Sequence, residues 1–372
     1  MKYSMHRNVP FFLVLAFSLL FFWGCADAGP REFPPERSGG ASRSGSAGKI
    51  TYIDVHAHPM GNIRSAGGMP EEDFQGAARA ALAAMDRMGI AKTILMPFPF
   101  FPNLPGIFDI DELVSRVGTQ SGRFAFLGGG GTLNIMVLQA FREGKTDAEL
   151  RSRFEEKALQ ILSKGAVGFG EMMAEHVSLG PDHSYGAVPP DHPLLLLLAD
   201  IAARYDVPID LHMEAVPEEM PLPEGLRSPP NPASLHANIP AFERLLSHNP
   251  KAKIIWAHAG WDQTGRRTTA LMADLLQRHS NLYMSIKIGR DSRPENRPMN
   301  SPGEIRPEWL ALIRAFPDRF LIGSDQFYLS PRAAQRFPQR TEVVNEFLSV
   351  LPAELARKVG YENPVRLFKL EK

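Results

Sequence analysis

The stretch Lys49-Ile50-Thr51-Tyr52-Ile53-Asp54-Val55-His56-Ala57-His58-Pro59 decides the fold of this chain. Its β-branched and aromatic side chains, bounded by Gly48 and Pro59, predict a short buried strand. Side chains two positions apart on a strand point to the same side. His56 and His58 therefore share one face at the carboxyl end of the strand, about 7 Å apart along the backbone, where both imidazoles can bind one divalent cation. Taken alone, the pattern also fits two ordinary loop histidines, so the rest of the chain must decide.

The composition limits the classes of protein to which the chain can belong. Its 372 residues leave room for one large α/β barrel or two ordinary domains. Hydrophobic residues make up 44% of the chain, which is enough for a sizeable core. Lys plus Arg and Asp plus Glu number 41 each, so the charge balance indicates neither a nucleic-acid surface nor an acidic tail.

The amino terminus has the features of an export signal. A positively charged start precedes a mainly apolar run of thirteen residues, Phe11 to Trp23, which is short for a membrane span and suits the core of a signal peptide. Cys25, the only cysteine, follows directly, so the chain has no internal disulfide and no cysteine metal site. Trp23-Gly24-Cys25-Ala26 resembles a bacterial lipoprotein signal, which implies a lipid on Cys25. Plain secretion or an uncleaved anchor is the alternative.

These features divide the chain into three parts. Residues 1–24 are expected to be the signal peptide. Residues 25–49, rich in Gly, Ser, Pro, Arg and Ala, are expected to be a flexible tether, and residues 50–372 one folded domain. We expect the protein in the bacterial cell envelope, attached to a membrane through its lipid, with a periplasmic or secreted protein as the alternative.

Beyond the tether, short apolar runs alternate with stretches of helical spacing. The runs that predict strands are 50–59, 92–97, 123–127, 166–171, 207–212, 253–258, 282–287 and 320–325. The stretches that predict helices are 71–88, 111–117, 147–163, 193–205, 239–247, 268–278, 307–315, 341–350 and 353–359. Eight strands separated by helices predict a single α/β domain with the (β/α)8 TIM-type barrel fold. An open doubly wound sheet, which usually has fewer strands, is the alternative.

Residues capable of chemistry gather at the carboxyl ends of these strands, where barrels of this kind have their active sites. They are His56, His58, Glu171, His212, His258 and Asp325. Each alone fits a structural role, such as a buried histidine, a cap or a buried ion pair. Their joint occurrence at strand ends favours a common site. Imidazoles and carboxylates without thiolates suit Zn²⁺, Mn²⁺, Ni²⁺ or Fe²⁺.

The set His56-x-His58, His212, His258-Ala259-Gly260 and Gly323-Ser324-Asp325 resembles the amidohydrolase superfamily, and more narrowly its branch with aminocarboxymuconate-semialdehyde decarboxylase. The closing Glu362-Asn363-Pro364-Val365-Arg366-Leu367-Phe368 is similar to that branch's terminal Asn-x-x-Arg-Leu-Phe signature. The resemblance runs from about Ile50 to the carboxyl end. It implies that the metal ligands are His56, His58, His212 and Asp325. It also implies that His258 binds a second metal or acts as an acid/base group. Glu171 takes the place where relatives carry a bridging carboxylate or a carboxylated lysine, although many single-metal members use neither.

A metal-dependent hydrolase is the function that these residues predict. A divalent ion lowers the pKa of the water it binds to about 7, and Asp325 beside that water can accept its proton and pass it to a leaving group. This fits hydrolysis of a small-molecule ester, lactone, amide or phosphoester. We expect one or two bound divalent ions, and zinc is the metal that we expect. Two alternatives stay open. One is a metal-dependent decarboxylase of a small carboxylic acid, and the other a non-catalytic, metal-containing envelope lipoprotein.

Substrate contacts are expected near the ends of the strands and in the long loops. Lys287, on the seventh strand, is the better candidate for facing the pocket, and Arg290 in the following loop can hold a carboxylate in bidentate fashion. The aromatic loop 97–102 can pack a hydrophobic substrate or form a lid on its own barrel. We expect a small-molecule substrate and no nucleic acid, and the sequence is compatible with an oligomer.

Overall fold

The computed structural model describes residues 50–63, 71–99, 101, 108–118, 122–180, 183–289, 292–301, 303–333 and 339–370. The predicted signal peptide and tether, including Cys25, lie outside these ranges, as does Arg290. Within the described ranges, no helix is long and apolar enough to cross a membrane.

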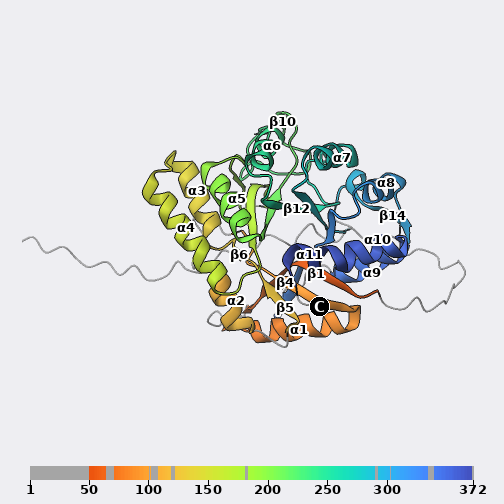
Figure 1. Cartoon of the computed structure of the whole chain (residues 1–372). Coiled ribbons are helices and arrows are strands. Elements are labelled where there is room, and N and C mark those ends of the chain that lie inside the picture. The colour runs from red at the N-terminus through yellow and green to blue at the C-terminus, as the bar shows by residue number, and fades with distance from the viewer. Residues whose placement is uncertain are drawn as a thin grey trace, which may run out of the picture.

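A ring of parallel strands forms the centre of the domain (Figure 1). In chain order the strands are β1 (Tyr52–Met60), β4 (Ile90–Leu95), β5 (Phe124–Phe126) with β6 (Gly128–Gly129), β7 (Phe169–His176), β9 (Pro208–Met213), β12 (Lys253–Ala259), β13 (Leu282–Ile286) and β16 (Phe320–Ile322). From β7 to β16 each strand pairs in parallel with the next, and β16 returns to β1 through Asp54↔Ile322. The predicted (β/α)8 barrel is confirmed.

The third strand of the ring is interrupted at Leu127. Its first part, β5, pairs with β4, and its second part, β6, pairs with β7. The backbone amide of Leu127 still donates to the carbonyl oxygen of Leu95 at 3.0 Å. The interrupted strand therefore joins the second strand to the fourth and closes the ring.

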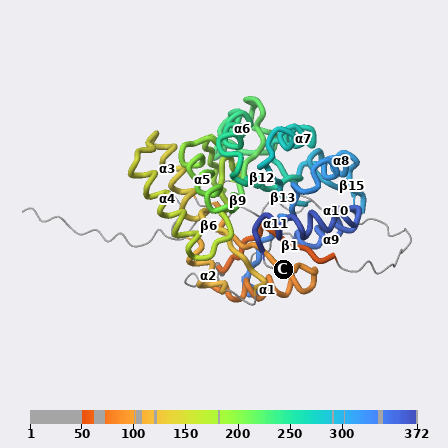
Figure 2. The backbone as a smooth tube through the Cα atoms, in the orientation of Figure 1, coloured from red at the N-terminus to blue at the C-terminus, as the bar shows by residue number. Residues whose placement is uncertain are grey.

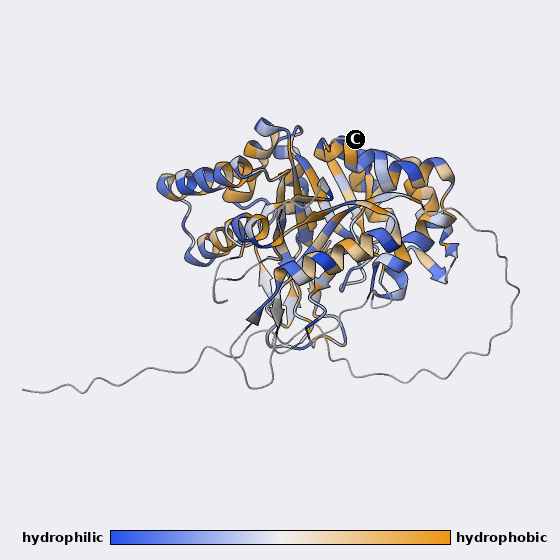
Figure 3. Ribbon diagram, turned by 90° about the horizontal axis from the view of Figure 1, so that it is seen from below, coloured by the Kyte–Doolittle hydropathy of each residue, from blue (hydrophilic) through white to orange (hydrophobic). Residues whose placement is uncertain are grey.

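Helices cover the outside of the ring, as the tube in Figure 2 shows. They are α1 (Phe74–Met88), α2 (Ile110–Val117), α3 (Leu133–Glu143), α4 (Ala148–Ser163), α5 (Pro193–Tyr205), α6 (Ile239–His248), α7 (Thr269–Arg278), α8 (Pro307–Ala315), α9 (Thr341–Val350), α10 (Ala353–Arg357) and α11 (Asn363–Phe368), with a π-helical turn at Lys358–Glu362. Because helices cover the parallel sheet, the strands are buried on both faces and consist of nearly continuous apolar residues. The hydropathy colours of Figure 3 show this in the largely orange central strands.

Most predicted helices match the structure to within a residue or two, and the differences have local causes. The helix expected over 71–88 begins only at Phe74, because the side chain of Asp73 caps it by accepting from the amide of Gly76 at 2.7 Å. The sequence did not predict α3, which follows directly on the glycine run 128–131. The predicted last helix, 353–359, ends as α10 at Arg357 and continues through the π-helical turn into α11.

The loops that follow the barrel strands contain short strands of their own. Three hairpins are formed by β2 (Asn62–Ile63) with β3 (Glu71–Glu72), β10 (Met220–Pro221) with β11 (Ser234–Leu235), and β14 (Met299–Ser301) with β15 (Glu304–Ile305). In addition, β8 (Gly186–Ala187) pairs with β7, β17 (Gln326–Leu329) pairs with β1, and a 3-10 turn spans Pro294–Asn296.

Two large clusters make up most of the hydrophobic core of the described residues, beside two small ones. The larger of the two large clusters lies between the strands and the helices, while the other fills the inside of the barrel. Inside, Leu367 and Phe368 at the end of α11 cluster with Ile53 and Leu321, which lie near the starts of their strands. The carboxyl terminus thus closes the amino-terminal end of the barrel, and the opposite end carries the polar residues.

Candidate metal centre

The two histidines of β1 face each other at the carboxyl end of the barrel. Their Nε2 atoms are 3.1 Å apart, and both side chains are buried. On its other side, His58 Nδ1 is 3.0 Å from the carbonyl oxygen of Met96, to which it must donate its hydrogen because that oxygen can only accept. His56 Nδ1 lies 3.2 Å from Asp210 Oδ1, a close ionic contact that is not aligned as a regular hydrogen bond. With a hydrogen on each Nδ1, both Nε2 atoms present lone pairs to the same place.

This arrangement fits a bound cation. The two Nε2 atoms, 3.1 Å apart, are held together favourably by a positive charge between them, either a shared proton or a bound divalent ion. Burial lowers the pKa of His56, but the carboxylates of Asp210 and Glu171 outweigh burial and hold this pKa well above its usual value. The surroundings therefore favour a positive charge at this position, and a divalent ion supplies one.

Glu171 of β7 lies between two pairs of histidines. Its Oε2 is 3.3 Å from His58 Nε2 and 3.5 Å from His56 Nε2. Its Oε1 is 2.7 Å from His212 Nδ1 and 3.1 Å from His258 Nε2, and these two nitrogens are themselves 3.1 Å apart. One carboxylate thus offers one oxygen to each pair.

Two sets of potential ligands result. The first is His56, His58 and Glu171, and the second is Glu171, His212 and His258, with the ligand atoms of each set within 4.8 Å of one another. Burial raises the pKa of Glu171, but His56, His212 and His258 outweigh burial and hold it well below its usual value, so this carboxylate is ionised. Burial and Lys287 hold the pKa of His258 well below its usual value, so this ring is neutral and able to bind a metal.

Asp325, which follows β16, lies beside the first set. Its Oδ1 is 3.3 Å from His58 Nε2 and 3.8 Å from His56 Nε2. Its Oδ2 is 2.6 Å from Lys287 Nζ and 3.6 Å from Arg340 Nη1. Burial raises the pKa of Asp325, but Lys287, His58 and Arg340 outweigh burial and hold it well below its usual value. One oxygen therefore faces the histidines while the other is held by cations.

Two of these residues have left-handed backbone conformations, with φ of 69° at His258 and 53° at Asp325. Such values are uncommon for residues other than glycine and persist where surrounding contacts hold them. The amide of Asp325 donates to the carbonyl oxygen of His56 at 2.9 Å, and the carbonyl oxygen of His258 accepts from the amide of Trp261 at 2.9 Å. The backbone at both residues is thus held by hydrogen bonds.

The structure thus brings together six side chains that the sequence singled out, namely His56, His58, Glu171, His212, His258 and Asp325. Lys287 is also at the site, with its ammonium group 3.5 Å from the centre of the Trp261 ring. Their roles as ligands or catalytic groups remain predictions. Arg290 and Cys25 lie outside the described residues, and their roles remain predictions as well.

Sequence reasoning missed several neighbours of the site. Asp210 is fully buried against His56, and the pattern Asp210-x-His212 on a strand repeats the spacing of His56-x-His58, which was the available signal. His176 lies at the end of β7, which extends five residues beyond its predicted end, and its ring centre is 4.9 Å from that of His212 and 4.6 Å from that of His183. No sequence pattern pointed to His183.

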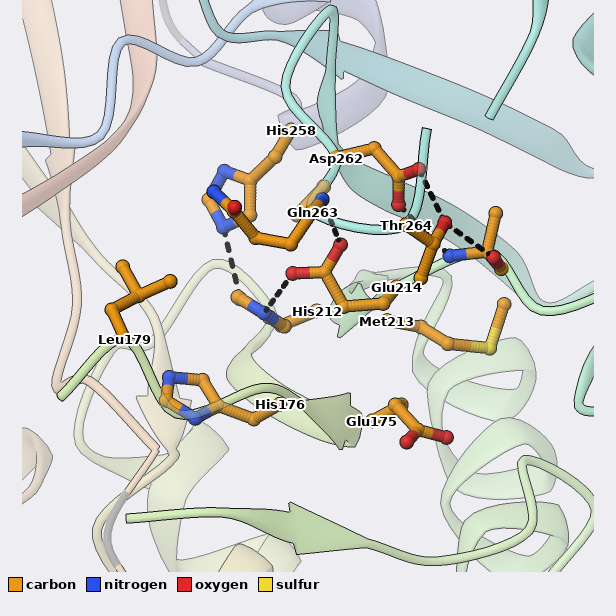
Figure 4. A network of polar contacts seen from close by, with 12 residues as sticks. Glu175, His176, Leu179, His212, Met213, Glu214, His258, Asp262, Gln263 and Thr264 are labelled. Atoms are coloured by element: carbon orange, nitrogen blue, oxygen red, sulfur yellow. Dashed lines mark hydrogen bonds and ion pairs between the residues drawn. The ribbon is translucent and has the colours of Figure 1, made fainter. Parts of the chain in front are cut away.

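A buried acidic network lies behind the second pair of histidines (Figure 4). Glu214 Oε1 is 4.0 Å from His212 Nε2, and Glu214 Oε2 accepts from the amide of Gln263 at 2.8 Å. Next to it, Asp262 accepts from the hydroxyl of Thr264 at 2.6 Å. The ring of His212 is thus bordered by carboxyl groups at both of its nitrogen atoms, and burial and the neighbouring Asp262 hold the pKa of Glu214 well above its usual value.

Comparison with known proteins gives a family match. The sequence model of the family described as amidohydrolase matches residues 154–370, more than half of the chain. No curated protein matches the chain.

Solved structures with a similar chain path include three examples from different organisms. A dihydroorotase of Saccharomyces cerevisiae with 5-fluoroorotic acid is 12% identical, over 87% of this chain and 85% of that chain, with a TM-score of 0.48. A dihydroxybenzoic acid decarboxylase of Polaromonas with bound manganese is 16% identical, over 87% of this chain and 98% of that chain, with a TM-score of 0.46. An amidohydrolase of Burkholderia multivorans with bound zinc is 14% identical, over 86% of this chain and 100% of that chain, with a TM-score of 0.45. No residue role follows from likeness of this degree.

Proposed function

The chain belongs to the amidohydrolase family, and on that basis we propose that it is a metal-dependent hydrolase of a small-molecule ester, lactone, amide or phosphoester. The observation that carries the proposal is the position of Glu171, whose two oxygens face two separate pairs of histidines. With Asp325 beside the first pair, this is a site for two divalent ions that share one carboxylate.

We assign the ligands accordingly. His56, His58 and Asp325 would hold the first ion with Glu171 Oε2, and His212 and His258 the second with Glu171 Oε1. The nitrogen and oxygen donors suit zinc, which is the ion we propose, and they also accept manganese, nickel or iron. The 3.1 Å between His258 Nε2 and Glu171 Oε1 favours a ligand role for His258 over a free acid/base role.

When bound, divalent ions in such sites activate water and polarise the bond to be cleaved. The protein's own residues then handle the proton and the substrate. Asp325 accepts the proton of the attacking water and returns it to the leaving group. Lys287, which already reaches Asp325 Oδ2, is the proposed contact for an oxygen of the substrate. Arg290, in the loop that follows, remains our second candidate for substrate binding.

Metal content and turnover test the proposal together. Purified protein, equilibrated with Zn²⁺ and then washed, is expected to hold two ions per chain by elemental analysis. It should hydrolyse a compound from a panel of lactones, esters, amides and phosphoesters, lose that activity to a chelator and regain it with Zn²⁺. Release of CO₂ from an aromatic acid in the same panel, without hydrolysis, would replace the proposal by a decarboxylase. Full metal content with no turnover at all would favour the non-catalytic alternative.

We also propose that the protein is attached to a membrane by a lipid on Cys25. Because that cysteine would be the only attachment, Cys25→Ser is expected to move the folded domain from the washed membrane fraction to the soluble fraction or to leave the uncleaved precursor. Fractionation and the mass of the amino-terminal peptide measure the change. The proposal is wrong if the substitution alters neither the mass nor the distribution between the fractions.

A further inference from the structure

The second pair of histidines lies where the regular pairing of two strands has ended. His212 is on β9 and His258 on β12, and the recorded register between these strands runs from Lys253↔Pro208 to Trp256↔Leu211. Beyond that point, the backbone at His258 turns into the left-handed region, with φ of 69°. Strand pairing alone therefore does not fix the 3.1 Å between His212 Nδ1 and His258 Nε2.

A buried arginine joins the two strands at this point. Arg267 is 2% exposed. Its Nη1 donates a hydrogen bond to the carbonyl oxygen of Ala257, and its Nη2 donates one to the carbonyl oxygen of Met213. Ala257 directly precedes His258, and Met213 directly follows His212. The guanidinium group is 4.1 Å from the centre of the Trp256 ring, whose Nε1 donates to the same Met213 oxygen at 2.8 Å.

The arginine is itself held in a fixed turn. Asp262 accepts from the backbone amides of Arg266 at 2.8 Å and of Arg267 at 3.2 Å. It also accepts from the amide of Ala215, beyond the end of β9, at 3.0 Å. The turn after β12 is thus tied to the chain after β9, with Asp262 and Thr264 beside Glu214 in Figure 4. Because this turn holds the arginine in place, its bidentate guanidinium group can set the distance between the ends of the two strands.

We propose that Arg267 is a positioning residue that sets the distance between His212 and His258, and so determines the binding of the second divalent ion. This inference rests on the two-ion site proposed above. The first ion is expected to depend on Arg267 much less, because His58 is held by the carbonyl oxygen of Met96 and His56 by Asp210, neither of which Arg267 contacts. Only Glu171 is common to both ions.

The experiment measures zinc binding to metal-stripped, full-length chain by equilibrium dialysis and elemental analysis. Arg267→Gln has a shorter, uncharged side chain with one donor nitrogen in place of Nη1 and Nη2. It is therefore expected to lower the affinity for the second ion by about 10- to 100-fold, the usual effect of removing a residue that orients a ligand. The first ion should keep its affinity within about twofold. Arg267→Lys keeps the charge but has a single donor nitrogen, so this variant should keep part of the chain's affinity for the second ion.

Arg319→Gln is the matched control. This half-buried arginine donates to the carbonyl oxygen of Leu282 at 2.6 Å and lies 5.2 Å from the centre of the Tyr283 ring, at the start of β13 and so at the far end of the barrel. Its loss is expected to lower the melting temperature while both ions remain bound.

Unchanged affinity for the second ion in Arg267→Gln overturns the inference, as does equal weakening of both ions, because Arg267 would then only support the fold. If that variant does not fold, Arg267→Lys decides by the same comparison of the two ions. A wild-type chain that binds a single zinc contradicts the two-ion site itself, and so separates a failure of the proposed function from a failure of this inference.

Discussion

Replacement of Glu171 by glutamine is expected to reduce the bound metal from two ions per chain to one at most. The carboxylate offers Oε2 to His56 and His58 and Oε1 to His212 and His258, all within 3.5 Å. Glutamine keeps one oxygen and places an amide nitrogen, which is a donor only, in one of the two positions. The lost ion is worth several kcal/mol in the transition state, so turnover is expected to fall by about 1000-fold. Elemental analysis and turnover on the substrate found in the panel measure both effects.

Glu175→Gln provides the matched control for this prediction. Glu175 lies on the same strand and is also buried, but its oxygens accept from the hydroxyl of Tyr185 at 3.0 Å and from the amide of Asn238 at 3.3 Å. Burial raises the pKa of Glu175 to about 7, so its carboxyl group is partly protonated at neutral pH and glutamine is a close substitute. This variant should keep both ions. Two tightly bound ions in Glu171→Gln would refute the bridging assignment.

Replacement of Asp325 by asparagine is expected to separate catalysis from metal binding. Asparagine keeps an oxygen near His58, so the metal content should fall only modestly. It cannot accept a proton at neutral pH, so turnover should fall by about 100-fold or more, the usual contribution of a positioned acid or base. The measurement is turnover of protein whose two ions have been verified by elemental analysis, so that loss of metal does not mimic loss of the base.

Asp318→Asn is the control for the change of carboxylate to amide. Asp318 lies away from the metal centre, where it pairs with Lys358 at 2.9 Å, and this variant should keep its turnover. Near-normal turnover in metal-replete Asp325→Asn would exclude the proposed proton transfer, even if every proposed ligand proved correct.

The barrel could be predicted from sequence because parallel strands covered on both faces consist of unbroken apolar runs. The same runs located the site, since the carboxyl ends of barrel strands meet in one ring. Elements without such a pattern were missed. Helix α3 follows a run of four glycines, and α11 was read only as a terminal signature. The start of α1 depended on a cap at Asp73, which shifts the boundary without changing the hydrophobic pattern.

The number of ions could not be predicted, because it depends on where the two oxygens of one side chain lie. The sequence placed Glu171 at a strand end but did not determine that Oε1 and Oε2 face different histidines. The contacts of Arg267 could not be predicted for a similar reason. This residue follows β12 by eight residues in the turn before α7, and only tertiary contacts bring its guanidinium group back to the ends of two strands.

The closure of the ring also fixes when the metal centre can form during synthesis. β1, which carries the first two histidines, pairs with β16 and β17. Asp54 accepts from the amide of Ser324 at 2.9 Å, across 270 residues of chain. Contacts between residues so far apart in sequence form late, because the intervening chain must first be ordered. Before Asp325 has been added, five of the six predicted ligands are already made but the ring that positions them is open. The centre is therefore assembled only after β16 and β17 have joined β1.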